Sequence, residues 1–340
     1  MNDNGLTREA QWFTQRADAK VVCSLCPHGC VIADGGHGIC KVRFNRGGAL
    51  TLPFYGRLSV LAVDPIEKKP LYHFHPGSPI LSAGFVGCSF RCKFCQNWRI
   101  SQSTDVETWP VSPSALVGKA REAGSFGIAY TYSEPLIHGE YLLDAARAGR
   151  EAGLKNVLVS NGYINPEPAE EVLSLMDAAN IDLKSYDADF YRSETGGRLD
   201  EVKRFLGQAA GRIHLEVTTL IIPTKNDDLG QLEQLAAFVA SLSPDIPLHL
   251  SCYYPQYKYT IPPTPPVLVK KLAEAARQHL RYVYVGNAGS EESNTACPKC
   301  GNLLIRRVGY SVKVDGLRSS GHGECSCTKC GTRVPIVVGA

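Results

Sequence analysis

The sequence predicts an α/β protein with a mainly parallel sheet, a small N-terminal cysteine-rich segment and a C-terminal zinc ribbon. Three observations support this. Strand-like and helix-like segments alternate through the middle of the chain, the first fifty residues are polar and rich in glycine and cysteine, and the alternation stops near residue 292 before two C-x2-C-G motifs. We therefore expect three parts, residues 1–50, 51–292 and 293–340.

The alternation covers seven apolar segments separated by amphipathic ones. Expected strands are 79–87, 127–135, 156–162, 181–186, 213–223, 247–255 and 282–286. Expected helices are 112–124, 138–153, 166–180, 199–210, 227–242 and 266–280, several of which begin with serine or proline or end at glycine. Repeated βαβ units imply parallel strands with helices outside, in an open sheet or in a full or partial barrel. In either fold the site lies at the carboxyl ends of the strands, where we find Cys88, Glu134, Asn161, Lys184 and Glu216.

The bulk composition excludes several classes. The 36 basic residues nearly balance the 33 acidic ones, so nothing favours nucleic acid or an acidic membrane. The polar first twenty residues lack the apolar core of a secretory signal, and no apolar run approaches the roughly 18 residues of a membrane span. We expect a cytoplasmic protein without a membrane partner.

Thirteen cysteines are many for a cytosolic chain, in which disulfides are disfavoured. Twelve fall into three groups, which indicates metal or cluster ligands. The groups are Cys23, Cys26, Cys30 and Cys40; Cys88, Cys92 and Cys95; and Cys297, Cys300, Cys325, Cys327 and Cys330. Cys252 stands alone, and we expect it to be a buried small hydrophobe.

The central group has only three thiols, Cys88, Cys92 and Cys95, spaced C-x3-C-x2-C. An iron–sulfur cubane normally takes four cysteines, so three would leave one iron open to a small molecule. Gly84 and Gly87 would allow a tight turn beside the cluster. The alternative is a zinc loop completed by a distant histidine such as His73 or His75.

This motif after the first strand of a β/α chain resembles the radical S-adenosylmethionine superfamily, and Phe94 before the third cysteine also fits. Further segments are similar to those of the AmmeMemoRadiSam-system radical enzymes, a branch related to pyruvate formate-lyase activating enzymes. These are CSLCPHGC…GHGICKVR, DPIEKKPLYHFHPGS, GCSFRCKFCQNW, YTYSEP, NGYINPEP, NIDLKSYDADFYR, LEVTTLIIPTKND, YVYVGN and CPKCG. The resemblance implies a full or partial (β/α)6-type barrel and a [4Fe-4S] cluster held by Cys88, Cys92 and Cys95. It also implies reductive cleavage of S-adenosylmethionine to a 5′-deoxyadenosyl radical that abstracts hydrogen.

The resemblance also implies roles for single residues. Phe94 would lie near the adenine, with a core aromatic as the alternative. Glu134 occupies the place of the acidic residue in a Gly-Gly-Glu-Pro motif that binds the amino group of the cofactor, although Tyr132 and Ser133 replace the glycines here. Further expected cofactor contacts are Ser160, Asn161, Asp182, Lys184, Glu216 and Thr218.

Periodicity places two of these residues together, because Asp182 and Lys184 share one face of a strand. The pair could form a structural salt bridge, whereas the resemblance implies contacts with the carboxylate or the ribose of the cofactor. Four tyrosines lie at the end of the expected strand 247–255 and in the loop that follows it. They either line a substrate pocket or belong to ordinary packing: Tyr253, Tyr254, Tyr257 and Tyr259.

The outer cysteine groups predict two further metal sites. Cys23, Cys26, Cys30 and Cys40 form a closed set for zinc or for a second iron–sulfur cluster, with His28 and His37 as spare ligands. Cys297, Cys300, Cys327 and Cys330 predict a zinc ribbon, in which Gly301 and Gly331 permit the turns and Cys325 is an alternative to Cys327.

We expect a radical enzyme that acts on a substrate the sequence does not identify. One alternative is an activase that installs a glycyl radical in a partner enzyme. The other is an RNA-modifying or RNA-binding zinc-ribbon protein, suggested by four basic residues, Arg306, Arg307, Lys313 and Arg318, which a solvated face explains more simply. Expected partners are a reductant such as flavodoxin or ferredoxin and, from the resemblance alone, Memo-like and AMMECR-like proteins.

Overall fold

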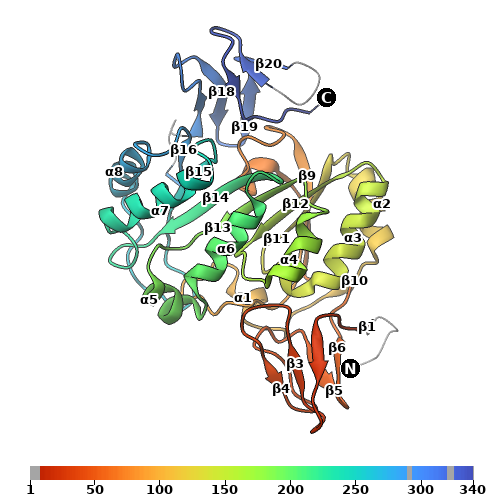
Figure 1. The fold of residues 1–340 in the computed structure, drawn as a ribbon. Coiled ribbons are helices and arrows are strands. Elements are labelled where there is room, and N and C mark those ends of the chain that lie inside the picture. Colours follow the sequence, from red (N-terminus) through yellow and green to blue (C-terminus); the bar gives the residue numbers. More distant parts are fainter. Residues whose placement is uncertain (1–7, 289–292, 320–324, 340) are drawn as a thin grey trace.

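The computed structural model describes residues 8–288, 293–319 and 325–339. Its centre is an eight-stranded sheet in which seven neighbouring strands run parallel and one edge strand is antiparallel (Figure 1). In spatial order the strands are β16 (Val283–Gly286), β15 (Leu248–Cys252), β14 (His214–Ile221), β13 (Ala178–Asp182), β12 (Lys155–Ser160), β11 (Gly127–Thr131), β9 (Pro79–Gly84) and the antiparallel β8 (Val60–Pro65).

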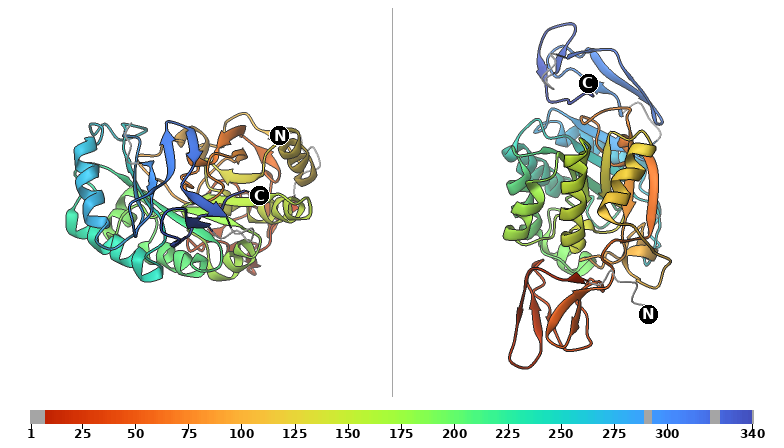
Figure 2. Two further views of the ribbon diagram at one scale, coloured as in Figure 1. Left: turned by 90° about the horizontal axis from the view of Figure 1, so that it is seen from above. Right: turned by 90° about the vertical axis from the view of Figure 1, so that its right-hand side faces the viewer.

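Helices connect the parallel strands and lie along the outside of the curved sheet (Figure 2). The longer ones are α2 (Pro113–Glu122), α3 (Gly139–Glu151), α4 (Pro166–Leu173), α6 (Leu199–Ala209), α7 (Leu229–Leu242) and α8 (Pro266–Ala276). Short helical turns are η1 (Ile66–Lys68), α1 (Trp98–Ser101), η2 (Pro135–His138), α5 (Ala188–Phe190) and η3 (Tyr191–Thr195). Side-chain caps fix two starts, since Ser112 Oγ accepts from the Ala115 amide at 3.2 Å and Asp228 Oδ1 from the Gln231 amide at 2.8 Å.

The expected α/β fold with a sheet of parallel strands is confirmed, and each of the seven expected strands overlaps one parallel strand. The sheet has eight strands, more than the six of the (β/α)6-type barrel that the resemblance implies. Strand order is open, with β16 and β8 at its edges, so the pairing among described residues does not close the sheet into a full barrel. The edge strand β8 was not anticipated.

One helix boundary was wrong. The expected helix 166–180 ends at Leu173, and β13 already begins at Ala178. Ala178 and Ala179 favour helices by intrinsic propensity, but both are fully buried and pair with β12 opposite Val157 and Leu158. Burial between neighbouring strands therefore overrides the local preference.

The N-terminal segment forms two small antiparallel sheets at the end of the molecule near α1 (Figure 1). One contains β1 (Arg8–Glu9), β6 (Ala49–Leu52) and β5 (Phe44–Arg46), the other β2 (Phe13–Gln15), β3 (Val21–Cys23) and β4 (Val31–Ile32). A buried ion pair fastens the segment to α3, because both terminal nitrogens of Arg43 donate to the Glu140 carboxylate at 2.9 Å. Such an Arg–carboxylate pair fixes orientation as well as position.

The C-terminal segment lies at the opposite end (Figure 1). It contains β17 (Thr295–Ala296), β18 (Leu303–Val308), β19 (Ser311–Val314), β20 (Leu317–Ser319), β21 (Cys325–Cys327) and β22 (Arg333–Val334). Outside this segment, β7 (Arg57–Leu58) and β10 (Trp109–Pro110) form a separate two-stranded sheet. The C-terminal segment docks on the loop before β9, where the Val337 amide donates to the His73 carbonyl at 2.8 Å and Arg307 Nη2 to the Tyr72 carbonyl at 2.6 Å. No helix in the described part of the chain has the length and apolar character to cross a membrane.

Candidate active site

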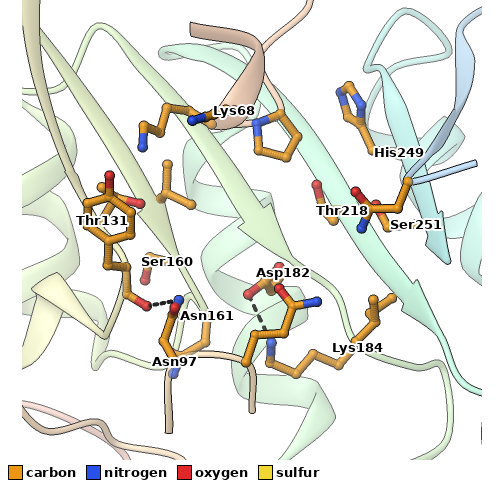
Figure 3. A pocket seen from close by; sticks show the side chains of 18 of the residues that line it. Lys68, Asn97, Thr131, Ser160, Asn161, Asp182, Lys184, Thr218, His249 and Ser251 are labelled. Carbon is orange, nitrogen blue, oxygen red and sulfur yellow. Dashed lines mark hydrogen bonds and ion pairs between the residues drawn. The ribbon is translucent and has the colours of Figure 1, made fainter. Parts of the chain in front are cut away.

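A cavity of about 860 Å³ runs along the inner side of the sheet (Figure 3). Its volume is at the upper end of the range of about 300–1,000 Å³ typical of ligand sites. One end is formed by the loop after β9 and by the last residues of β11, β12 and β13, including Cys88, Thr131, Ser160 and Asp182. The other end reaches the C-terminal segment at Arg307 and Tyr310.

The three cysteines of the central motif lie on the loop after β9, and all three line the cavity. Gly87 has φ +79°, and a Cβ there would lie 2.4 Å from the Cys40 carbonyl oxygen, so both its conformation and its surroundings require glycine. The loop is fixed by hydrogen bonds from the Arg91 amide to the Thr195 carbonyl at 2.7 Å and from the Gly87 amide to the Ile100 carbonyl at 2.8 Å. Burial raises the pKa of Cys92 to about 12, which means that a cationic centre must stabilise its thiolate form.

The zinc alternative for this loop needs a fourth ligand, for which His73 and His75 are the candidates. His73 is fully buried, and its Nε2 lies 2.6 Å from the Tyr284 hydroxyl. His75 stacks on Phe126 with a ring-centroid distance of 4.4 Å. Neither histidine lines the cavity.

Glu134 occupies a buried position directly beside this loop. Its carboxylate accepts hydrogen bonds from Ser160 Oγ at 2.6 Å and from the amides of Asn161 at 2.9 Å and Leu136 at 3.0 Å. Burial raises its pKa to about 7, although these three donors favour the ionised form. The side chain is therefore held in place by the end of β12 and by η2 while remaining able to gain or lose a proton near neutrality.

Tyr132 replaces a glycine of the related motif yet keeps a conformation that glycine favours, with φ +69°. Two contacts fix its ring: its hydroxyl donates to Asp64, and Lys69 Nζ lies 4.4 Å from the ring centroid. Ser133 lines the cavity with a buried hydroxyl that has no hydrogen-bond partner. The turn before Glu134 is thus preserved despite the substitutions.

Asp182 and Lys184 meet on the cavity wall, as their strand spacing predicts (Figure 3). Lys184 Nζ lies 2.9 Å from Asp182 Oδ2. Although burial opposes a charged ammonium, the Asp182 carboxylate raises the pKa of Lys184, which is therefore cationic. Figure 3 shows Ser160 and Asn161 on the neighbouring strand, and Asn161 Nδ2 lies 3.7 Å from Cys88 Sγ.

Glu216 lies elsewhere, near the amino end of β14, and does not line the cavity. Its oxygens lie 3.0 Å from His214 Nε2 and 2.6 Å from His249 Nε2, and accept from the amides of Tyr72 at 3.0 Å and His73 at 2.7 Å. Although burial opposes its charge, these partners lower the pKa of Glu216 well below its usual value. Both carboxylate oxygens of Glu216 are engaged by these partners, so Glu216 holds the loop before β9. Its position does not support the expected contact with the cofactor.

Of the aromatic candidates, one lines the cavity and four do not. Phe94 lines the cavity but also packs against Phe190 and Tyr259, at ring-centroid distances of 5.9 and 5.7 Å. The four candidate tyrosines do not line the cavity: Tyr253, Tyr254, Tyr257 and Tyr259. Thr218 does line it.

Sequence reasoning missed the residues of the far end of the cavity. They come from η1, the loop before β9, β15 and the C-terminal segment, and include Glu67, Lys68, Lys69, Tyr72, His249, Ser251, Arg307 and Tyr310. Several belong to the DPIEKKPLYHFHP stretch, whose paired lysines and aromatic residues could have drawn attention. Glu67 is 6% exposed; its Oε1 lies 3.7 Å from Arg307 Nε, and its buried Oε2 has no hydrogen-bond partner.

The C-terminal cysteines form a compact group that could hold a metal ion. The sulfur atoms of Cys297, Cys300, Cys327 and Cys330 all lie within 4.8 Å of one another. Gly301 and Gly331 have φ of +69° and +73° after the two C-x2-C turns. Cys325 is outside the group, where it is 1% exposed and packs in a small apolar core.

Comparison with known proteins agrees with this geometry. Residues 84–239 match the model of the radical SAM superfamily. An uncharacterized protein of Methanocaldococcus jannaschii is 39% identical over 339 residues, covering 97% of this chain and all of that protein. The pyruvate formate-lyase-activating enzyme of Clostridium pasteurianum is 26% identical over 46% of this chain and 68% of its own length. Among solved structures, a radical SAM methyltransferase from Sphaerobacter thermophilus has a TM-score of 0.49 at 14% identity, over 82% of this chain and 76% of that one.

Residues 84–239 of the chain belong to the radical SAM superfamily. The chain is related to the pyruvate formate-lyase activating enzymes. This superfamily implies a [4Fe-4S] cluster and S-adenosylmethionine, and the residues present fit both groups. Three thiols line a large cavity, and a buried carboxylate and a lysine–aspartate pair line it with them.

The raised pKa of Glu134 predicts a pH dependence of stability in the cofactor-free protein. Between pH 4.5 and about 7 the folded chain keeps a proton that the unfolded chain loses, so wild-type stability falls as the pH rises. Relative to Glu134→Gln, the free energy of unfolding of wild type should fall by about 3 kcal/mol across this pH window and should not fall further above it.

Denaturant unfolding at several pH values checks this, with Glu122→Gln on the exposed face of α2 as the control, for which the difference from wild type should be constant. A Glu134→Gln difference that is equally flat would show that Glu134 titrates normally.

Proposed function

We propose that Cys88, Cys92 and Cys95 hold the [4Fe-4S] cluster and that the adjoining part of the cavity binds S-adenosylmethionine. When bound, these groups supply reductive cleavage to methionine and a 5′-deoxyadenosyl radical, which abstracts hydrogen from a substrate in the cavity. The arrangement that supports this best is the meeting of three cavity-lining thiols with the buried Glu134 carboxylate at the carboxyl ends of parallel strands.

The residues of this chain bind and orient the cofactor. Glu134, held by Ser160 and the Asn161 amide, accepts a hydrogen bond from the amino group of the cofactor. The Lys184 ammonium faces the carboxylate or the ribose of the cofactor, and Asp182 keeps that ammonium charged and in position. Phe94 supplies an apolar surface next to the third cysteine.

The far end of the cavity remains for the substrate. It is lined by the polar or charged side chains of Ser251, Arg307 and Glu67 and by the aromatic residues Tyr72 and Tyr310. We therefore place the substrate between the radical site and the C-terminal segment, which closes that end.

Removal of one cluster ligand tests this function. Anaerobically reconstituted protein with dithionite and S-adenosylmethionine should form 5′-deoxyadenosine, and Cys88→Ala should reduce the rate at least about a thousandfold because the cluster loses a ligand. Cys252→Ala, which removes a buried thiol outside the three groups, is the matched control and should retain the rate. The 5′-deoxyadenosine is measured by chromatography with mass detection. Its absence from reactions of wild type with a full cluster would contradict the proposal.

A glycyl-radical activase is the second candidate, favoured by the similarity to activating enzymes from Clostridium pasteurianum and Klebsiella oxytoca. If this function is correct, a partner enzyme from the same cell should acquire the doublet of a glycyl radical in its electron paramagnetic resonance spectrum. A spectrum without the doublet for every candidate partner would exclude it. The RNA alternative loses one of its basic residues, because Arg307 is 2% exposed and bonded to Thr295 and to two backbone carbonyls.

The partners and the branch remain proposals that rest on the sequence motifs: membership of the AmmeMemoRadiSam branch, and Memo-like and AMMECR-like proteins as partners. Activating enzymes of this superfamily generally use a reductant such as flavodoxin or ferredoxin, and we propose the same here.

We also propose that the C-terminal cysteines bind zinc. Four thiolates at about 2.3 Å around a tetrahedral zinc ion have sulfur–sulfur distances of about 3.8 Å. The observed distances are 3.6 Å between Cys297 and Cys330 and 3.7 Å between Cys300 and Cys327. A single ion therefore fits the space without rearrangement, and it would stabilise a segment with a small core.

Two neighbouring cysteines provide a matched test of the zinc site. Cys327→Ser should lose about one zinc per chain, because a tetrahedral structural site uses all four ligands. Cys325→Ser, two residues away on the same strand, should keep its zinc, since Cys325 lies outside the group. Zinc content after anaerobic purification is measured by mass spectrometry of the elements; equal loss in both variants would contradict the assignment.

A further inference from the structure

The four cysteines of the N-terminal segment share one site that the radical chemistry described above does not use. Cys23, Cys26 and Cys40 are buried and Cys30 is half-buried. A Cβ at Gly38 would lie 3.6 Å from Cys40 Sγ and 3.8 Å from Cys30 Sγ, so these two thiols border the same small space. The Cys26 thiol lies close enough to the other three to interact with each electrostatically.

The spacing of these thiols differs from that of the C-terminal group. In residues 8–288, 293–319 and 325–339, only the C-terminal cysteines form a group of three or more ligands with all ligand atoms within 4.8 Å. In every set of three N-terminal sulfur atoms at least one pair is therefore more than 4.8 Å apart, which is wider than the about 3.8 Å between thiolates around one tetrahedral zinc ion. In a cubane each thiolate binds a different iron, which requires such a wider arrangement.

We propose that Cys23, Cys26, Cys30 and Cys40 hold a second iron–sulfur cluster rather than a zinc ion. Arg43 supports this assignment. Its guanidinium is 1% exposed and interacts with the Cys23 thiol, and its Nε has no hydrogen-bond partner. Hydrogen bonds beside the sulfur atoms tune such clusters, and the Arg43 Nε–H is a donor without a partner, while its two terminal nitrogens are paired with Glu140.

The second cluster would lie directly against the loop that carries Cys88. The Cys40 carbonyl oxygen packs on Gly87, and His28 Nε2 lies 2.8 Å from the Ser89 carbonyl oxygen. Gly87 and Ser89 are the two neighbours of Cys88 in the chain. The described residues between 8 and 66 contribute nothing to the cavity wall, so this cluster does not contact substrate.

This position gives the cluster a role in electron delivery, a role that rests on the function proposed above. It takes one electron from a one-electron protein reductant and passes that electron to the cluster at Cys88, returning to its oxidised state. Entry is on the outer side, where the half-buried Cys30 is flanked by Val31 and Ile39, which are 55% and 39% exposed.

Metal content and spectra of three variants test the second cluster. Wild type should contain about eight irons per chain, and Cys88→Ser/Cys92→Ser/Cys95→Ser should contain about four, with a reduced paramagnetic resonance signal that ignores S-adenosylmethionine. Cys26→Ser/Cys30→Ser should also contain about four, with a signal that responds to S-adenosylmethionine. Cys252→Ser is the control and should match wild type.

Zinc in place of iron in the triple variant, or about four irons in wild type, would overturn the second cluster. The wild-type iron count decides even if a variant fails to fold. If the radical function is wrong but the second cluster is right, the triple variant still holds about four irons while no sample responds to S-adenosylmethionine, so the two failures are distinguishable.

Reduction kinetics test the electron route. Reduced flavodoxin should reduce the Cys88 site at least about tenfold more slowly in Cys26→Ser/Cys30→Ser than in wild type, whereas dithionite, a small molecule, should reduce both alike. Equal rates with flavodoxin would overturn the route.

Discussion

The proposed radical site depends on a single constraint: one short loop supplies three cysteines, and neither His73 nor His75 lines the cavity beside them. The histidines that could have closed the set are engaged elsewhere, His73 with Tyr284 and His75 with Phe126. The loop itself is fixed from two sides. The N-terminal segment presses the Cys40 carbonyl against Gly87, and the η3 turn receives the Arg91 amide. In the proposed site, packing around the loop would thus keep one coordination position of the cluster open.

Two fully buried carboxylates show how the surroundings assign different tasks to the same chemical group. Glu134 has only neutral donors, so burial dominates and raises its pKa to about 7. Glu216 has two histidines and two amides, and its pKa falls well below the usual value. The first carboxylate can respond to a ligand in the cavity, whereas the second is a permanent anion that fastens the loop before β9 to the sheet. Glu134 lies after the carboxyl end of β11, whereas Glu216 lies near the amino end of β14, and this difference in position decides which role applies.

Much of the fold and the near end of the cavity could be predicted from the sequence, because both depend on local order along the chain. Apolar strands, helix caps and the C-x3-C-x2-C spacing are local, and they gave the parallel sheet, the cysteine loop and the Asp182–Lys184 pair. Boundaries failed where tertiary burial decides, as at Ala178.

The far end of the cavity could not be predicted, because it is assembled by contacts over long distances in the sequence. Arg307 reaches the Tyr72 carbonyl across 235 positions, and Glu216 reaches the Tyr72 amide across 144. A lone arginine or glutamate carries no local mark of such a partner. The distances between sulfur atoms in the two outer cysteine groups could not be predicted from the sequence either. Each group has four cysteines, but only in the C-terminal group do all four sulfur atoms lie within 4.8 Å of one another.

The most direct test of the central claim is electron–nuclear double resonance of the reduced protein with S-adenosylmethionine labelled at its amino nitrogen and its carboxylate oxygens. If the loop leaves one iron open, both labels should show hyperfine coupling to the cluster, and the coupling should persist in Cys26→Ser/Cys30→Ser. A fully loaded cluster without coupling to either label would contradict the account, because it would mean that the fourth iron is closed to the cofactor.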